Sequence, residues 1–112
     1  MSVTIVRPSE RDLQPVREGN PILLQVVADG LDGNPYVHVT EVPPGHHIAA
    51  HSHSEDEVTV ILSGVAIVDG AECGAGTLLV IPADQSYAID AGAEPLVFAV
   101  IRPRKAEYDG PR

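Results

Sequence analysis

The sequence is poor in cysteine and in aromatic residues. Its 112 residues include one cysteine, Cys73, one phenylalanine, three tyrosines and no tryptophan. A single cysteine excludes an intrachain disulfide and gives no sign of an oxidising compartment, so a structural thiol is expected. Because 44% of the residues are nonetheless hydrophobic, the interior must consist mainly of Val, Ile, Leu and Ala. That composition favours strands over helices.

Positive charge is also scarce. Seven Lys and Arg stand against sixteen Asp and Glu, giving a formal net charge of -9. A surface of this sign cannot neutralise a phosphate backbone and disfavours docking on anionic membranes. No apolar run is long enough to cross a bilayer, and residues 1–4 lack a basic region followed by an apolar signal core. We therefore expect a cytoplasmic protein without nucleic-acid or membrane partners.

Short apolar or alternating runs recur along the chain, separated by segments rich in Gly, Pro, Asn and Asp. The runs are 22–28, 36–42, 58–62, 65–68, 77–81, 87–89 and 95–101. Closely spaced short strands of this kind indicate an all-β sandwich or barrel, and no segment carries a sustained helical period. The length suits one domain over residues 1–112, with the barrel core at about 20–103.

The two ends of the chain differ from this core. Residues 9–19 are polar and contain Pro15, which predicts a loop with at most one helical turn. Residues 106–112 form a charged tail with little to bury. We expect this tail to fray or to pack on a partner subunit.

Two histidines and a glutamate form the most informative pattern in the sequence. Side chains alternate along a strand, so His51 and His53 point the same way. A turn through Ser54–Asp56 would bring Glu57 back beside them in a β-hairpin. Two imidazoles and one carboxylate would then share one pocket, and this pattern predicts a metal site.

The spacing of these residues resembles the first signature of the cupin superfamily. Gly45, His51, His53, Glu57 and Gly64 occupy its five fixed positions. The second signature is present in part. Gly76 and Pro82 match it, whereas Asp84 replaces the usual second Gly, Tyr87 the usual His and Ala91 the usual Asn.

The resemblance implies a small double-stranded β-helix or jelly-roll barrel, a bound divalent metal and, often, a homodimer. It also implies that His51, His53 and Glu57 are the metal ligands here, because Tyr87 stands where the fourth ligand is usual. Two imidazoles and one carboxylate are the donor set of facial-triad Fe(II) oxygenases, and they leave coordination positions open. The same donors accept Mn, Ni, Co, Cu or Zn, so the identity of the metal stays open.

Several neighbouring residues have more than one plausible role. Tyr87 would ligate the metal as a phenolate, donate a proton or hydrogen bond to substrate, or fill the barrel mouth with its hydroxyl in water. His47 has the strand parity of His51 and His53, and His38 lies on the preceding predicted strand with Tyr36 and Thr40 on its face, so either could reach the pocket. His46 is expected in a solvated turn. Asp56 is expected to point outward.

Strand parity also suggests a wall for the pocket. Thr59 and Ile61 have the same parity as Glu57, and with Leu78 and Val80 on a later strand they could form its apolar side. Parity leaves open which face of that later strand is inside. Ser52, between the two histidines, is expected to point outward.

The leading functional hypothesis is a metal-dependent small-molecule enzyme of the dioxygenase, isomerase or lyase class. The metal would polarise a substrate oxygen while Tyr87 or His38 supplies or removes a proton. The alternative is a barrel that binds or senses a small ligand without turnover, and a third possibility is an accessory subunit that dimerises through its sheet.

Overall fold

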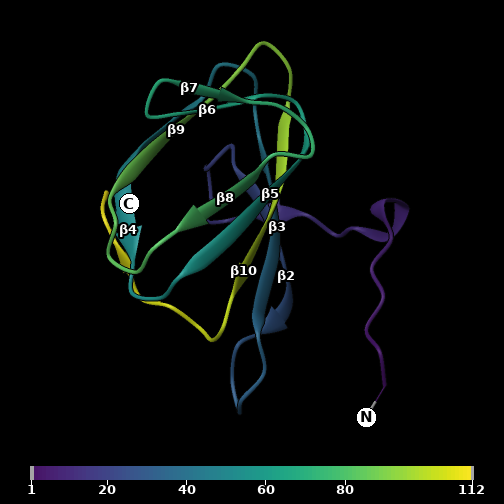
Figure 1. Ribbon diagram of the computed structural model, residues 1–112. Helices are drawn as coiled ribbons and strands as arrows, with labels where there is room; N and C mark the ends of the chain where they lie inside the picture. The colour runs from purple at the N-terminus through teal and green to yellow at the C-terminus, as the bar shows by residue number, and fades with distance from the viewer. Residues whose placement is uncertain (1, 112) are drawn as a thin grey trace.

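The computed structural model describes residues 2–111, which form two antiparallel sheets around a shared core (Figure 1). The larger sheet has the strand order β1 (Gln14–Pro15), β2 (Leu23–Asp29), β3 (Tyr36–Val42), β10 (Leu96–Arg102), β5 (Glu57–Ser63) and β8 (Leu78–Ile81). The smaller has the order β11 (Tyr108–Asp109), β4 (His47–His53), β9 (Tyr87–Ala91), β6 (Ala66–Val68) and β7 (Ala71–Cys73). The described residues contain no α-helix.

The prediction of an all-β jelly-roll barrel is confirmed, and each run predicted as a strand overlaps an observed strand. Three observed strands were not predicted. Two of them, β1 and β11, are two-residue edge strands in the terminal segments. The third, β7, lies inside the Gly-rich stretch 70–76 and pairs with β6. Three residues between glycines are too few for a period of two to be recognised. Cys73, at the end of β7, is a free, buried thiol.

The expected β-hairpin around the two histidines is not formed. β4, which carries His51 and His53, lies in the smaller sheet and pairs with β9 and β11. β5, which begins at Glu57, lies in the larger sheet and pairs with β8 and β10. The chain therefore crosses from one sheet to the other at residues 54–56. Glu57 faces the histidines across the barrel instead of lying beside them in one sheet.

The core lies between the sheets and follows the alternation of the strands. On β5 the side chains of Glu57, Thr59 and Ile61 are buried, whereas Val58 and Leu62 are exposed. The buried apolar side chains of this core come from strands of both sheets. They include Val42, Ile61, Ala66, Ile89, Leu96, Phe98 and Val100.

The outer face of the larger sheet is apolar as well. Val80, Val58 and Ile101 are direct cross-strand neighbours on β8, β5 and β10, and all three are exposed. Leu78, two residues before Val80, is 64% exposed and Val80 itself is 77% exposed. Most solvent-facing sheets carry polar side chains here, so this face is unusual for a sheet in contact with water.

The C-terminal tail does not fray within the described residues. It folds back on its own chain, where Tyr108 pairs with His53 and Asp109 with Ser52 as strand β11. The Ser54 hydroxyl accepts a 2.8 Å hydrogen bond from the Glu107 amide, which ties the tail to the turn after β4. The tail therefore adds an edge strand to the smaller sheet.

The N-terminal lead-in contains one 3-10 turn, η1 (Pro8–Glu10), followed by the two-residue strand β1. Within residues 2–111 we find no helix with the length and apolar character that crossing a membrane requires. The cytoplasmic location expected from the sequence stays a prediction.

Candidate functional site

A cavity of about 500 Å³ lies between the two sheets. Its apolar lining includes Ile22, Leu24, Ile48, Ile89, Phe98 and Val100. Its polar lining includes all five histidines of the chain together with Glu57, Tyr87, Arg102 and Tyr108. A volume of this size suits a small organic molecule. The cavity therefore combines an apolar wall with a cluster of titratable groups.

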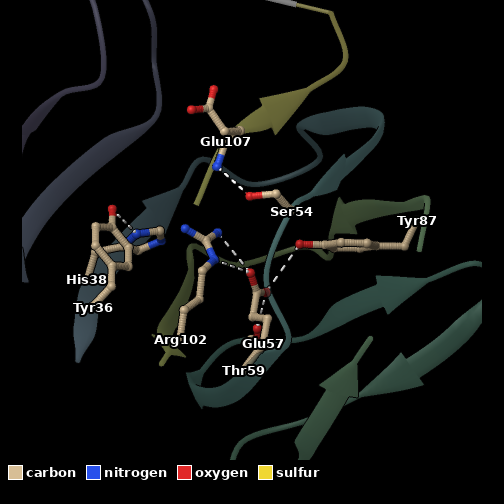
Figure 2. Close-up of polar contacts among 8 residues, drawn as sticks. All are labelled: Tyr36, His38, Ser54, Glu57, Thr59, Tyr87, Arg102 and Glu107. Atoms are coloured by element: carbon tan, nitrogen blue, oxygen red, sulfur yellow. Dashed lines mark hydrogen bonds and ion pairs between the residues drawn. The ribbon is translucent and has the colours of Figure 1, made fainter. Parts of the chain in front are cut away.

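Glu57 is the hub of the polar cluster, as Figure 2 shows. Its carboxylate is 2% exposed, and its Oε2 accepts hydrogen bonds from Thr59 Oγ1 at 2.6 Å and from the Tyr87 hydroxyl at 3.2 Å. Oε1 accepts from Arg102 Nε and Nη2. Burial alone would raise the pKa of Glu57, but the Thr59 hydrogen bond and the Arg102 charge outweigh it and lower that pKa. The carboxylate is thus held ionised.

Arg102 supplies the opposite charge and is 6% exposed. Its Nε and Nη2 lie 3.0 and 2.8 Å from Glu57 Oε1. Arg102 ends β10, which lies between β5 and β3, and its partner on β3 is Tyr36. The guanidinium carbon lies 5.1 Å from the centroid of the Tyr36 ring, a cation–π contact. Two neighbouring strands therefore fix this side chain in the barrel.

His51 has a defined tautomer. Its Nδ1 lies 2.9 Å from the carbonyl oxygen of Ala49, which can only accept, so Nδ1 carries a hydrogen. In the neutral ring the lone pair is then on Nε2. The ring packs between two tyrosines, with centroid distances of 4.6 Å to Tyr87 and 5.4 Å to Tyr108. His51 is therefore a buried, oriented imidazole with one nitrogen able to accept a proton.

His53 and His38 are held neutral. Burial first, and the Arg102 charge second, lower the pKa of each to about 4. The rings of His53 and His51 are 5.1 Å apart in an edge-to-face arrangement. His38 Nδ1 shares a 2.9 Å hydrogen bond with the Tyr36 hydroxyl. The structure thus places His38 on the cavity lining, at the side opposite Tyr87 in Figure 2.

Tyr87 lines the cavity, and its hydroxyl donates to Glu57 instead of reaching water. Burial, with the Glu57 charge as the next cause, raises the pKa of Tyr87. A phenol with a raised pKa keeps its proton, so this arrangement does not favour the phenolate role considered from the sequence. The role as a hydrogen-bond or proton donor stays a prediction.

His47 and His46 lie at the rim of the cavity. His47 has an exposed side chain, and its Nδ1 lies 2.6 Å from Asp90 Oδ1 on the adjacent strand β9. Both residues contribute to the lining, but neither belongs to the Glu57 cluster. Asp56 points away from the cavity, and its Oδ1 accepts from the Ala83 amide at 2.8 Å.

The residues predicted to bind a metal all line the cavity, but they do not fit a resident cation as they are placed. Both Glu57 oxygens already accept hydrogen bonds from two donors each. A carboxylate has about four lone-pair sites, so none is left for a metal. Within residues 2–111 no group of three or more His, Cys, Asp or Glu side chains is placed to hold a metal ion. The metal role of His51 and His53 stays a prediction.

Reasoning from the sequence missed two residues of the site, Arg102 and Tyr108. Arg102 lies 45 positions from Glu57 and meets it only through the pairing of β10 with β5. An arginine is rarely buried at a strand position unless it is paired with an opposite charge. The position of Arg102 directly after the apolar run 95–101 was the signal that could have indicated a buried ion pair.

The predicted apolar wall was wrong, because none of its four residues lines the cavity. Thr59 donates a hydrogen bond to Glu57, Ile61 is buried in the core, and Leu78 and Val80 point outward.

Comparison with known proteins shows similarity in fold but not in sequence. No family model matches the chain, and no curated protein matches it. Among solved structures, KdgF from Halomonas sp. is 20% identical, with 93% of this chain and 96% of that chain covered and a TM-score of 0.74.

Two further structures extend the likeness. RemF, a polyketide cyclase from Streptomyces resistomycificus, is 19% identical, with 97% of this chain and 85% of that chain covered and a TM-score of 0.78. An RmlC-like cupin protein from Ralstonia eutropha is 11% identical, with 98% of this chain and 76% of that chain covered and a TM-score of 0.81. At these identities the likeness lies in the arrangement of strands.

Proposed function

We propose, from the cupin fold that this likeness establishes, that the chain binds a small organic molecule in its barrel and acts on it by proton transfer. The observation that carries the proposal is the cavity of about 500 Å³, in which an apolar wall faces the oriented imidazole of His51 and the neutral imidazole of His38. Pockets that bind small molecules combine these two features. The likeness in fold to a polyketide cyclase adds support, since that protein is an enzyme by name.

His51 is the residue best placed to accept a proton. Its Nδ1–H is engaged by the Ala49 carbonyl, so Nε2 is the basic nitrogen. A carbon acid next to a carbonyl would lose its proton to Nε2, and the electron pair would move to the carbonyl oxygen. Return of the proton to another carbon would complete an isomerisation. General-base catalysis of this kind contributes about 100-fold or more in rate.

The oxygen that gains charge in this step needs a hydrogen-bond donor. Tyr87 retains its proton and lies 4.6 Å from His51, ring centroid to ring centroid, so its hydroxyl can turn from Glu57 to a bound oxygen. His38 lies farther round the lining and is the second candidate to exchange a proton. In this proposal Glu57 and Arg102 position Tyr87 and do not react.

Proton exchange in D₂O tests this function without knowledge of the natural substrate. Exchange of the hydrogens next to the carbonyl of dihydroxyacetone and cyclohexanone would be followed by NMR with the wild-type chain. We expect acceleration over buffer that falls about 100-fold in His51→Gln and less in Tyr87→Phe. Glu72→Gln, at an exposed position of β7 outside the cavity, is the control. An exchange rate that His51→Gln leaves unchanged would count against the proposal.

A binding or sensing barrel without turnover is the second candidate. It is favoured by the completeness of the polar network, because no buried side-chain nitrogen or oxygen among the described residues lacks a hydrogen-bond partner. A satisfied network rigidifies a pocket. A compound that raises the melting temperature and is recovered unchanged, with no exchange of its hydrogens, would favour this reading.

A metal-dependent form of the enzyme is a narrower hypothesis that rests on the resemblance. It requires Glu57 to leave Arg102 so that His51, His53 and Glu57 can bind Fe, Mn, Ni, Co, Cu or Zn. When bound, such an ion would polarise a substrate oxygen. The metal content of the purified protein tests it.

A homodimer is the assembly that the outer face of the larger sheet supports best. Exposed Leu78, Val80, Val58 and Ile101 form one apolar surface across β8, β5 and β10. Contiguous apolar surface of this kind marks interaction sites. A second copy of the chain would cover it with an identical surface, as two-fold symmetry requires.

A further inference from the structure

Four hydrogen bonds converge on the Glu57 carboxylate, two on each oxygen. Two of them come from one guanidinium, and charge-assisted hydrogen bonds of that type are roughly twice as strong as those between neutral groups. Both partners are almost wholly buried, at 2% and 6% exposed. An ion would have to displace Arg102 or two hydroxyl donors to reach Glu57.

The position of Arg102 is set by its neighbours on both sides. β5 presents Glu57 on one side, and β3 presents Tyr36, whose ring lies against the guanidinium, on the other. The positive charge therefore cannot swing away without losing both contacts. A divalent ion bound between Glu57 and the two histidines would lie close to this charge, and like charges in a buried site repel strongly.

We infer that Arg102 is the resident cation of this barrel. Its guanidinium neutralises Glu57 where the resemblance implies a metal ion, and it keeps the native site closed to divalent transition metals. Removal of the guanidinium opens a latent site in which the Glu57 carboxylate and the imidazoles of His51 and His53 bind one such ion. The inference is independent of the proposed proton-transfer function, because it concerns only what the cluster binds.

Cobalt and zinc binding test this inference in the full chain. The wild type, Arg102→Met and Arg102→Gln would be purified without chelator, and Co²⁺ binding would be followed by visible absorption and equilibrium dialysis. Arg104→Met is the matched control, since Arg104 also pairs with a glutamate, Glu55, but does not line the cavity. Melting temperatures with and without Zn²⁺ give a second readout.

We expect one Co²⁺ per chain in the two Arg102 variants and none in the wild type or Arg104→Met. Adding Glu57→Gln, or His51→Gln with His53→Gln, to Arg102→Met should abolish the binding. Stoichiometric Co²⁺ in the wild type, or none in either Arg102 variant, would overturn the inference. If the variants unfold without metal, refolding with Co²⁺ must recover them, and failure to do so also counts against it.

Discussion

The ring of Tyr108 stacks on the ring of His51, with centroids 5.4 Å apart and planes 25° apart. The contact depends on the close approach of the C-terminal tail, because a Cβ on Gly110 would lie 2.6 Å from His51 Cβ. The hydroxyl of Tyr108 donates to the Pro111 carbonyl. The tail is thus one wall of the cavity and orients the imidazole that the proposed function uses as a base.

Replacement of Tyr108 by Ala should destabilise the chain and loosen His51. Loss of the aromatic contact alone costs about 0.5–1.5 kcal/mol, measured as the free energy of unfolding in urea. Tyr108→Phe keeps the ring and loses only the hydroxyl, so it should remain closer to the wild type. Equal stability of the Ala and Phe variants would show that the stack contributes nothing.

The two glycines at the ends of the signature should differ in their tolerance of a side chain. Gly45 and Gly64 have φ angles of +70° and +77°. Alanine at either position costs about 1–2 kcal/mol for the left-handed conformation. At Gly64 the new Cβ would also lie 2.3 Å from the Pro95 carbonyl oxygen, whereas nothing lies within 4 Å at Gly45. In chemical denaturation, Gly64→Ala should therefore have a clearly lower free energy of unfolding than Gly45→Ala. The reverse order would refute the packing argument.

Stability should fall as the solution is made acidic. The pKa values of His38 and His53 are lowered to about 4 in the folded chain from 6.5. Between those values the unfolded chain binds more protons than the folded one, so the free energy of unfolding rises with pH across this window. The pKa of Glu57 is also lowered in the folded chain. Its contribution to the free energy of unfolding is therefore lost as the pH falls through that folded-state pKa.

Urea unfolding at several pH values measures this slope, and NMR titration of the imidazole carbons identifies the groups responsible. His38→Gln should flatten the curve, because its amide does not titrate. Imidazole signals of His38 and His53 that both titrate near 6.5 would contradict the low pKa values.

The apolar outer face should control the oligomeric state. Leu78→Asp and Val80→Asp place a charge on exposed positions of β8, so neither disturbs the core. If the chain is a dimer through this face, light scattering should show dissociation to monomers in both variants. A charge at Val3, which is also exposed but lies outside the sheets, is the control. A wild type that is monomeric at high concentration would rule out this dimer.

Local pattern was sufficient for much of the fold. Alternation and turn residues located the main strands, and the same alternation placed Thr59 and Ile61 on the buried side of β5. The local pattern was insufficient where the same short segment could join strands that pair in more than one way. A three-residue turn after His53 connects two strands equally well within one sheet or across two, and only the pairing with β9 and β10 decides.

The cluster around Glu57 shows the same limit. His51, His53 and Glu57 were recognised because they lie within seven residues of one another, and the structure places all three on one cavity. Arg102 was missed because its contact with Glu57 depends on strand register between distant segments. A buried carboxylate indicated that some positive partner was needed, and the sequence suggested a metal ion where the structure has a guanidinium.

Because the pocket is divided between two sheets, it exists only when both sheets are folded and packed together. Neither sheet alone brings the imidazoles of β4 opposite the carboxylate of β5, so an intermediate with one sheet unravelled has no pocket at all. Any molecule that binds in the interior therefore binds only the closed barrel and stabilises it. The melting temperature should then rise with the concentration of that molecule.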